Sequence, residues 1–358
     1  MLPGMPLLTR PDLWPTAAVN LKDVLLRGRL ADTTPLPSTV IATGPQLTLH
    51  RYERTQPARH DLPVLLVPPL AAPAVCFDLR RGCSVAEHLL DSGHPTYLVD
   101  YGEIAFGDRR LGIEHWVDDV LPTAIRAVSA DAGGRAVQLV GWSLGGVFSM
   151  LVTADDKTLP VASVAAIGSP IDFTQVPLVA PIRPLAALTG GRLLTGVYRA
   201  LGSAPAPVVQ KAFQATGITS YLTRPIAVAA NITDREFLAQ IEAVDRFMGQ
   251  MLAYPGRTFG QLYHRLFRAN DLLDGRLDLD GREIDLTTIG VPLLSVAGTG
   301  DGIAPVACVH HIGALVPHAE LRTAPGGHLG VLTGRKARAT TWVALAEFLA
   351  ANDLAAVG

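Results

Sequence analysis

The chain has 358 residues, a formal net charge of −2, 49% hydrophobic residues and 17% charged residues. This length allows two or three small domains, or one large domain with an insertion, and it suffices for a large core without metal or disulfide staples. The high apolar content excludes a disordered chain. The balanced charge, with no run of more than two Lys or Arg, excludes a nucleic-acid binder that relies on clustered positive charge.

The cysteines and the N-terminal residues indicate the cellular compartment in which the protein is expected. The cysteines are Cys76, Cys83 and Cys308, an odd number without CxxC spacing, so the sequence predicts reduced thiols in a cytoplasmic protein. The N-terminus has no basic residue ahead of its first apolar stretch, unlike a signal peptide. The longest uncharged run, 136–154, contains three glycines, each costing about 1 kcal/mol inside a helix. We therefore expect a strand, a turn and a helix there rather than a membrane span.

In chain order, residues 1–61 predict an N-terminal extension with a helix over 14–29 and two strands over 38–44 and 46–52. From residue 62 the pattern changes to short apolar strands that alternate with helices, and this first part of a core continues to residue 170. The predicted strands cover 63–69, 95–102, 136–140 and 161–170, and the predicted helices cover 84–93 and 113–130, the latter with a kink at its proline.

The same alternation returns over residues 286–358, with strands at 291–298 and 319–325 and helices at 306–316 and 335–352. Strands that are apolar throughout and separated by helices predict an α/β fold with a mostly parallel central sheet flanked by helices. The intervening residues 171–285 differ, because their first part is apolar and rich in proline and glycine and their middle, 234–254, is an amphipathic helix. We predict an inserted helical cap that shapes a pocket, with the stretch from Leu185 to Leu201 covering an apolar substrate.

The most specific motif is GWSLG at residues 141–145, between a predicted buried strand and a predicted helix. This is the G-x-S-x-G nucleophile elbow, in which a tight turn raises the serine hydroxyl above the sheet. Gly141 and Gly145 would leave the room that the turn needs. Ser143 is the predicted nucleophile, and the helix that starts beside it directs unpaired N–H groups toward developing negative charge.

A serine nucleophile needs a base and an acid, which follow it in the order acid then histidine in this type of fold. His328 lies in GGHLG after the last predicted strand, and it is the predicted base. Asp301, directly after the strand 291–298, is the predicted acid, and Asp172, after an earlier strand, is the competing candidate. The other histidines are expected in helices or at the surface. No metal and no cofactor are predicted.

An oxyanion hole requires two N–H donors aimed at the tetrahedral oxygen. Leu144, which follows the nucleophile, is the first predicted donor. The second should come from the loop after the strand 63–69, where Pro68 and Pro69 have no N–H. Leu70 or Ala71 remains, and Leu70 is the preferred candidate.

These residues resemble the α/β-hydrolase superfamily and, within it, the poly(3-hydroxyalkanoate) synthase branch. The matching segments are LLVPPL, GHPTYLVDYG, GWSLGG, GSPIDF, LDLDGREIDLTTIGVPLLSVAGTGD and GGHLGV, which spread over most of the chain after residue 62. The resemblance implies a triad of Ser143, Asp301 and His328. The chain departs from that family's pattern at Ser143, where the synthases use cysteine, at Gly302, where they carry histidine, and at Val306, which replaces a tryptophan.

Serine in place of cysteine favours hydrolysis, because an ester on serine is a less activated acyl donor than a thioester on cysteine. The sequence thus predicts a cytoplasmic serine hydrolase of the esterase, lipase or thioesterase type that acts on hydrophobic acyl groups. The alternatives are a synthase-like acyltransferase that uses hydroxyacyl-CoA, and a non-catalytic lipid-granule or scaffold protein. The predicted partner is a small hydrophobic acyl substrate and no nucleic acid. Peripheral contact with a lipid or membrane surface and a homodimer are both compatible with the sequence.

Overall fold

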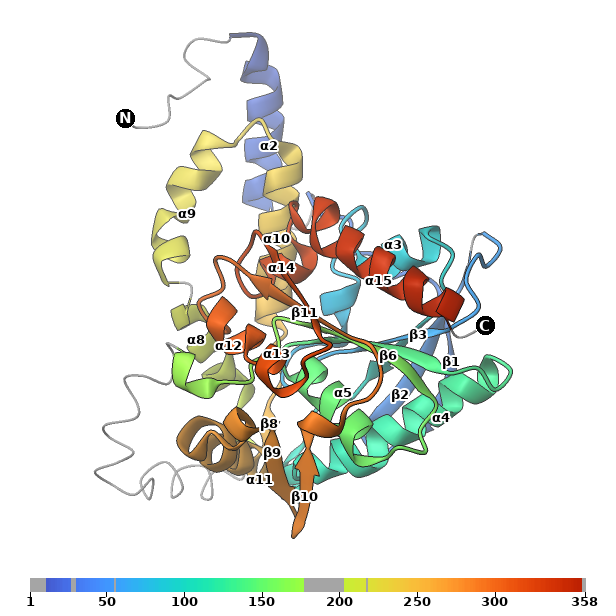
Figure 1. Ribbon diagram of the computed structural model, residues 1–358. Coiled ribbons are helices and arrows are strands. Elements are labelled where there is room, and N and C mark those ends of the chain that lie inside the picture. Colours follow the sequence, from blue (N-terminus) through green and yellow to red (C-terminus); the bar gives the residue numbers. More distant parts are fainter. Residues whose placement is uncertain (1–10, 27–29, 55, 177–202, 217, 356–358) are drawn as a thin grey trace, which may run out of the picture.

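The computed structural model describes residues 11–26, 30–54, 56–176, 203–216 and 218–355. Its centre is an eight-stranded sheet with the order β1-β2-β4-β3-β5-β6-β11-β12 (Figure 1). The pairs β1–β2 and β2–β4 are antiparallel and the other neighbours are parallel, so the predicted mostly parallel sheet is confirmed. The strands are β1 (Ser38–Gly44), β2 (Leu47–Tyr52), β3 (Val64–Val67), β4 (Thr96–Asp100), β5 (Val137–Trp142), β6 (Val161–Ile167), β11 (Leu293–Gly298) and β12 (Glu320–Ala324).

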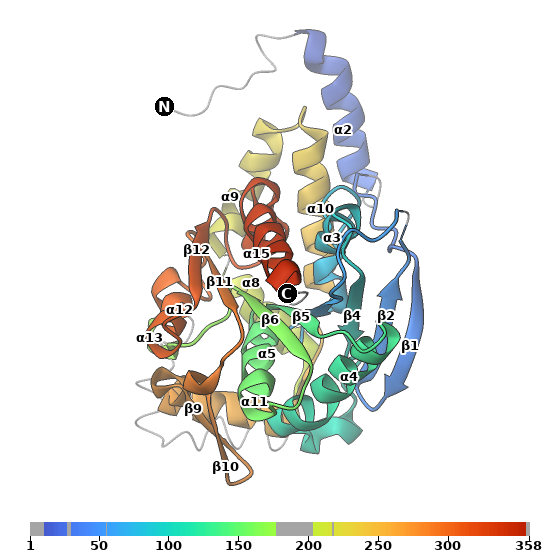
Figure 2. The ribbon, with the colours of Figure 1, turned by 45° about the vertical axis from the view of Figure 1, so that its right-hand side comes forward.

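Helices cover both faces of the sheet, as expected for strands that are apolar throughout. In β3, Leu65 and Val67 pack in the cluster with α4 (Leu121–Asp131) and α5 (Leu144–Asp155). Val64 and Leu66 face the other way, toward α3 (Val85–Asp91) and α15 (Thr341–Ala355). Figures 1 and 2 show these two pairs of helices on opposite sides of the strands.

Three predicted helices differ from the observed ones. The predicted helix 113–130 winds as a π-helix over His115–Val120 and becomes α4 at Leu121, because Pro122 has no N–H for a regular bond to the preceding turn. The predicted helix 306–316 is divided into α12 (Val306–His310) and α13 (Ile312–Leu315). The predicted helix 335–352 is α15 from Thr341 onward, and its first residues instead contain a 3₁₀ turn over Ala337–Ala339.

The N-terminal helix α2 spans Trp14–Leu26, and the last three residues of its predicted range lie outside the described residues. Between β6 and β11 the chain forms α8 (Ala206–Thr216), α9 (Ile218–Ala230), α10 (Arg235–Gly249) and α11 (Gly256–Gln261). It also forms the pair β7 (Ser203–Ala204) with β8 (Tyr254–Pro255), and the hairpin β9 (Arg276–Leu279) with β10 (Arg282–Asp285). In both views α2, α9 and α10 extend beyond the sheet on the same side (Figures 1 and 2). The predicted cover from Leu185 to Leu201 lies outside the described residues.

The amphipathic helix predicted over 234–254 is α10, which ends earlier, at Gly249. It begins after Asp234, whose side chain accepts a hydrogen bond from the amide of Phe237 at 2.9 Å. Such an N-cap satisfies one of the amides that the first turn leaves without an intrahelical acceptor. Local sequence therefore determines where this helix starts, and its apolar residues Ala243 and Phe247 join the core.

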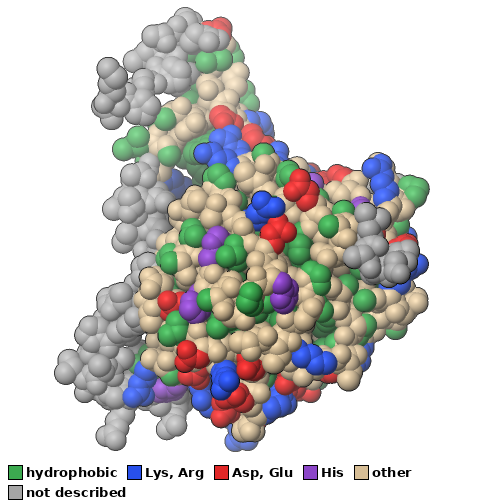
Figure 3. Space-filling view, viewed as in Figure 1, with side chains coloured by type: hydrophobic (Ala, Val, Ile, Leu, Met, Phe, Trp, Pro, Cys, Tyr) green, Lys and Arg blue, Asp and Glu red, His purple; other side chains and the backbone are tan. Residues whose placement is uncertain are grey.

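The long uncharged run forms β5, the turn at Ser143 and most of α5, as predicted. Within the described ranges, we find no helix with the length and apolar character that a bilayer crossing requires. Basic and acidic side chains are interspersed over the face that Figure 3 shows, in keeping with the net charge of −2.

Candidate active site

Ser143 lies in a strained turn between the end of β5 and the start of α5. Its φ of 54° and ψ of −125° are unusual for a residue with a side chain, and such conformations cost roughly 1–3 kcal/mol. A side chain at Gly141 would overlap the backbone of Gly146, and one at Gly145 would overlap the carbonyl oxygen of Val67. The elbow therefore requires glycine at both positions, for the steric reason that the motif suggests.

The structure brings Ser143, His328 and Asp301 together. The Ser143 Oγ lies 2.9 Å from His328 Nε2, and the His328 Nδ1 lies 2.8 Å from Asp301 Oδ2. An ionised carboxylate only accepts hydrogen bonds, so Nδ1–H donates to Asp301, and Nε2 is free to accept the hydroxyl proton of Ser143. This is the geometry that general-base activation of a serine needs.

Asp301 is well suited to orient the histidine. Its side chain is fully buried, and its second oxygen, Oδ1, accepts hydrogen bonds from the amides of Ile303 and Ala304, both at 2.8 Å. These amides fix the carboxylate plane and leave Oδ2 for His328. Asp301 follows β11 and His328 follows β12, so neighbouring parallel strands carry both groups to one edge of the sheet.

Asp172, the competing acid, has different partners. Its Oδ1 accepts hydrogen bonds from the amide and hydroxyl of Thr174, and from the side chain of Asn270. Burial acts to raise the pKa of Asp172, but these hydrogen bonds outweigh it and lower the pKa. The carboxylate caps a short 3₁₀ turn at residues 173–175, so the geometry assigns it a structural contact.

The two predicted oxyanion donors are placed by α5 and by the cavity wall. Leu144 is the first residue of α5, where amides lack an intrahelical acceptor. Leu70 contributes to the wall of the cavity that contains Ser143 and His328. Ala71 has a φ of 64°, and its carbonyl oxygen accepts a hydrogen bond from the amide of Leu252 at 2.8 Å. The segment after α10 thus contacts the loop from which the second donor is predicted to come.

Ser143 and His328 open into a cavity of about 510 Å³. Apart from these two residues, its wall is mainly apolar, and much of it comes from α10. The ion pair between Arg224 of α9 and Asp245 of α10 also contributes to the wall. The apolar lining includes Leu70, Trp142, Phe237, Ile241, Val244, Phe247, Met248, Met251, Tyr254 and Leu329. A mainly apolar cavity with a few polar groups at one place is the usual form of a small-molecule site.

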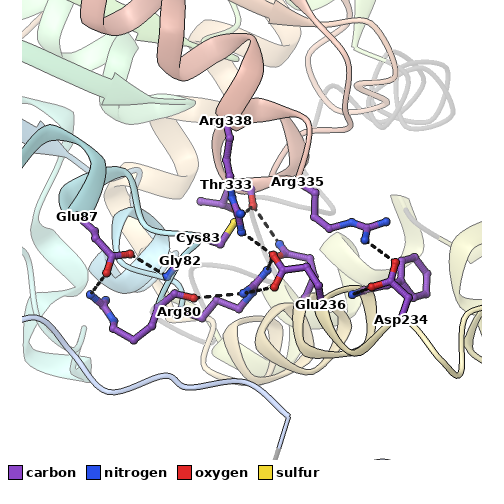
Figure 4. Close-up of polar contacts among 12 residues, drawn as sticks. Arg80, Gly82, Cys83, Glu87, Asp234, Glu236, Thr333, Arg335 and Arg338 are labelled. Atoms are coloured by element: carbon purple, nitrogen blue, oxygen red, sulfur yellow. Dashed lines mark hydrogen bonds and ion pairs between the residues drawn. The ribbon is translucent and has the colours of Figure 1, made fainter. Parts of the chain in front are cut away.

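Polar contacts attach α10 to the core beside the cavity (Figure 4). Glu236 accepts hydrogen bonds from the buried Arg80 at 2.8 Å and from Arg338 at 2.6 Å. The hydrogen bond from Arg80 is the main cause that lowers the pKa of Glu236. Asp234 pairs with Arg335 at 2.7 Å. Because Arg335 and Arg338 follow His328 in the chain, the segment that carries the histidine also pairs with α10.

The cysteines and the paired histidines of the chain lie outside this arrangement. The three cysteines are free and buried, and burial raises the pKa of each thiol, to about 12 for Cys308. The ring nitrogens of His310 and His311 contact backbone oxygens of Arg322 and Leu273. In the described part of the chain, no group of three or more His, Cys, Asp or Glu could hold a metal ion.

His94 contradicts the expectation that the remaining histidines lie in helices or at the surface. It lies in the loop before β4, is only 1% exposed and stacks on His60 with ring centroids 3.8 Å apart. A neutral imidazole can be buried in this way because it carries no charge and its flat ring stacks on that of His60. Burial, reinforced by His60, lowers the pKa of His94 to about 4.

Trp142 is the site residue to which the sequence assigned no role. It occupies the second position of the elbow, and its indole contacts His328. The only signal in the sequence was its place beside the nucleophile, because the contact depends on where the loop after β12 lies.

This sheet, with a serine elbow after β5, is an α/β-hydrolase fold. Its sequence resembles the poly(3-hydroxyalkanoate) polymerases, as the motifs indicated. No model of a known protein family matches the chain.

Two relatives and one solved structure illustrate the similarity. The poly(3-hydroxyalkanoate) polymerase subunit PhaC of Haloferax mediterranei is 23% identical over 329 residues, covering 88% of this chain and 64% of the relative. The chain thus spans less than two thirds of that relative. The PhaC of Allochromatium vinosum is 24% identical, with 91% of each chain covered. The crystal structure of an aryl-esterase candidate from Burkholderia cenocepacia has a TM-score of 0.51 at 14% identity, covering 88% of this chain and 99% of that one.

Proposed function

We propose that the chain is a serine hydrolase that cleaves esters or thioesters of hydrophobic acyl groups through an acyl-enzyme. The observation that carries the proposal is the hydrogen-bonded series from Ser143 Oγ to His328 Nε2, and from His328 Nδ1 to Asp301, at the wall of an apolar cavity. The groups that we propose as nucleophile, base and orienting acid are therefore in contact, beside a cavity that would hold the substrate.

The reaction would proceed in two halves. In the first, Ser143 Oγ attacks the carbonyl carbon while His328 Nε2 takes the hydroxyl proton, and the amides of Leu144 and Leu70 bind the oxyanion. The carbonyl then re-forms, and the leaving group departs with the proton from Nε2. In the second half, His328 takes a proton from water, the resulting hydroxide attacks the acyl-enzyme, and Ser143 is released with its proton. Asp301 stabilises the imidazolium in both halves.

The substrate class follows from the cavity. Its wall offers mainly apolar side chains, so an aliphatic acyl chain gains about 0.8 kcal/mol for each CH₂ that leaves water. The deciding experiment offers p-nitrophenyl esters, triacylglycerols and acyl-CoAs to the purified chain and identifies the products. Free fatty acid from any of them, absent in the Ser143→Ala variant, supports hydrolysis. Turnover by Ser143→Ala equal to that of the wild-type chain rejects the proposal.

A second candidate is acyl transfer from hydroxyacyl-CoA, as in a polymerase. The relatives named as poly(3-hydroxyalkanoate) polymerases favour it. It predicts that CoA is released together with an insoluble polyester or a new ester, and without free acid. The serine at position 143 argues for water as the acceptor, because its ester is less activated than a cysteine thioester.

The non-catalytic alternative is tested by a fluorophosphonate probe. An activated Ser143 attacks the phosphorus, loses its proton to His328 and displaces fluoride, leaving a stable adduct. We expect this adduct on Ser143, and a chain that forms none would favour a scaffold. A lipid-surface contact, a homodimer and a cytoplasmic location stay predictions.

A further inference from the structure

Trp142 lies between Gly141 of the elbow and the nucleophile, at the end of β5. It is only 4% exposed. The elbow geometry requires glycines around Ser143 but puts no demand on residue 142, whose side chain leaves the turn on the face of the sheet that holds α3 and α15. The indole is therefore a feature of this chain that the nucleophile turn does not explain.

The indole contacts His328 in two ways. Its Nε1–H donates a hydrogen bond to the backbone carbonyl oxygen of His328 at 3.1 Å. Its ring also lies beside the imidazole, with centroids 5.2 Å apart and planes inclined by 39°. The hydrogen bond thus holds the backbone of the histidine, and the indole ring packs against the imidazole.

The loop that carries His328 needs such support. Gly326 has a φ of 145°, in a region open only to glycine, and Gly327 follows it directly. Two glycines before a histidine leave its backbone with more freedom than other residues would. The indole N–H reaches this loop from the last residue of β5, directly before Ser143. It therefore connects the loop of the proposed base to the turn of the proposed nucleophile.

On the other side, the indole packs near Phe247 of α10, with ring centroids 6.3 Å apart. Phe247 is 2% exposed and also borders the cavity. The indole is thus enclosed between the cap helix and the histidine, which limits the positions that it can adopt.

We propose that Trp142 is a positioning residue for His328, which holds the histidine backbone through its N–H and stabilises the imidazolium through its ring. This inference rests on the proposed function, since in the reaction the imidazolium forms when Ser143 gives up its proton. Cations within about 6 Å of an aromatic centroid are attracted by the ring, and indole is the strongest of the side chains in this respect.

The chain supplies a matched control in Trp342. Its Nε1–H donates to the carbonyl oxygen of Leu332 at 2.7 Å, on the segment that follows His328, and it is 5% exposed. Its ring lies beside His88 rather than His328. Trp342→Phe therefore removes an equally buried indole hydrogen bond to the same segment without touching the triad.

The test compares Trp142→Phe, Trp142→Leu and Trp342→Phe with the wild-type chain. The readout is the rate at which a fluorophosphonate probe labels Ser143 between pH 5 and 9, with thermal unfolding followed in parallel. Phenylalanine keeps an aromatic face but loses the N–H, so Trp142→Phe should label roughly two- to tenfold more slowly at the pH plateau. The acidic limb of its pH profile should stay where it is.

Trp142→Leu removes the ring as well. Without the ring the imidazolium is less stable, so neutral His328 persists to lower pH. The acidic limb should then move down by roughly half a pH unit, in addition to the slower plateau. Trp342→Phe should lower the unfolding temperature while its labelling rate and pH profile match the wild-type chain.

Labelling of Trp142→Phe at the wild-type rate overturns the inference, as does an equal loss in Trp342→Phe. An unmoved acidic limb in Trp142→Leu overturns it too. All three leave the proposed function intact, provided that Ser143 of the wild-type chain is labelled. A wild-type chain that forms no adduct overturns the proposed function itself, and the positioning role falls with it.

Discussion

The central sheet and the helical segment at residues 203–285 shape the same cavity in different ways. The sheet contributes the reactive groups, which follow the ends of β5, β11 and β12 at one edge. Backbone geometry fixes them: a strained φ at Ser143 and two amides on Asp301. The helical segment contributes apolar side chains, mainly from α10.

The two regions are also held by different forces. Inside the core, strands and helices meet through buried apolar residues on both faces of the sheet. The helix α10 adds ion pairs to its apolar contacts, as between Arg80 and Glu236. The comparison suggests that substitutions in α10 change which substrate binds, while substitutions at the sheet edge change whether the reaction occurs.

The largest effect is expected at the nucleophile. Ser143→Ala removes the attacking oxygen, so kcat should fall by ~10⁶, as in measured serine triads. The measurement is steady-state hydrolysis of the best ester from the substrate panel. Ser92→Ala, in which the lost hydroxyl donates to the carbonyl oxygen of His88, serves as the control and should retain wild-type kcat.

The next effect separates the two candidate acids. Asp301→Asn should lower kcat by ~10⁴, because an amide favours the wrong tautomer of His328 and stabilises the imidazolium poorly. Asp172→Asn should leave kcat unchanged, since Asp172 contacts Thr174 and Asn270 instead. The measurement is kcat of both variants on the same ester under identical conditions. A larger loss in Asp172→Asn than in Asp301→Asn would assign the orienting role to Asp172.

The stability of the fold should depend on pH through a buried histidine of the core. Burial lowers the pKa of His94 to about 4 in the folded state, from an ordinary 6.5. The unfolded chain therefore binds a proton first as the pH falls, and the folded state loses stability between pH 6.5 and pH 4, by about 3 kcal/mol from this residue.

Urea unfolding at pH 7 and pH 4.5 measures this loss. In His94→Phe, which cannot titrate, the difference between the two pH values should shrink. His318→Gln changes an exposed histidine and should behave as the wild-type chain. An undiminished difference in His94→Phe would place the acid sensitivity elsewhere.

A smaller and more selective effect is expected in the cap helix. Val244 of α10 borders the cavity, so Val244→Trp should shorten the acyl chains that fit. We expect kcat/KM for long esters to fall by roughly tenfold or more, with little change for acetate esters. Arg246→Trp places the same side chain at an exposed position of α10, and its chain-length profile should be unaltered.

The smallest effect concerns the attachment of α10. Glu236→Gln keeps an acceptor for Arg80 and Arg338 but removes the charge, which should cost about 1 kcal/mol and lower Tm by about 2 °C. Glu320→Gln removes the same charge from an exposed pair with Arg322 and should change Tm less. Equal shifts in calorimetry would mean that the buried Arg80 adds nothing.

Sequence patterns predicted much of this architecture. The period and apolarity of the strands indicated a mostly parallel sheet, and the sheet has that form. Helix ends were less predictable, because a buried turn at Ala337 and a break at His311 depend on packing that local propensity does not encode. The buried position of His94 was missed for the same reason.

The candidate site divides in a similar way. GWSLG and the order of Ser143, Asp301 and His328 could be recognised because local turn chemistry and chain order are properties of the sequence itself. A choice between Asp301 and Asp172 required knowing which carboxylate reaches the imidazole, and both follow strands of the same sheet. The contacts of Trp142 also had no sequence signature.

The sequence alone thus determined the alternation of strands and helices, the turn that carries the serine, and the order of the reactive residues, since each follows from neighbours in the chain. Only the tertiary structure decided which acid meets the histidine, which face of α10 borders the cavity, and where the indole lies. The physical reason is distance along the chain: Ser143 and His328 are 185 residues apart, and strand order and register bring them within 2.9 Å.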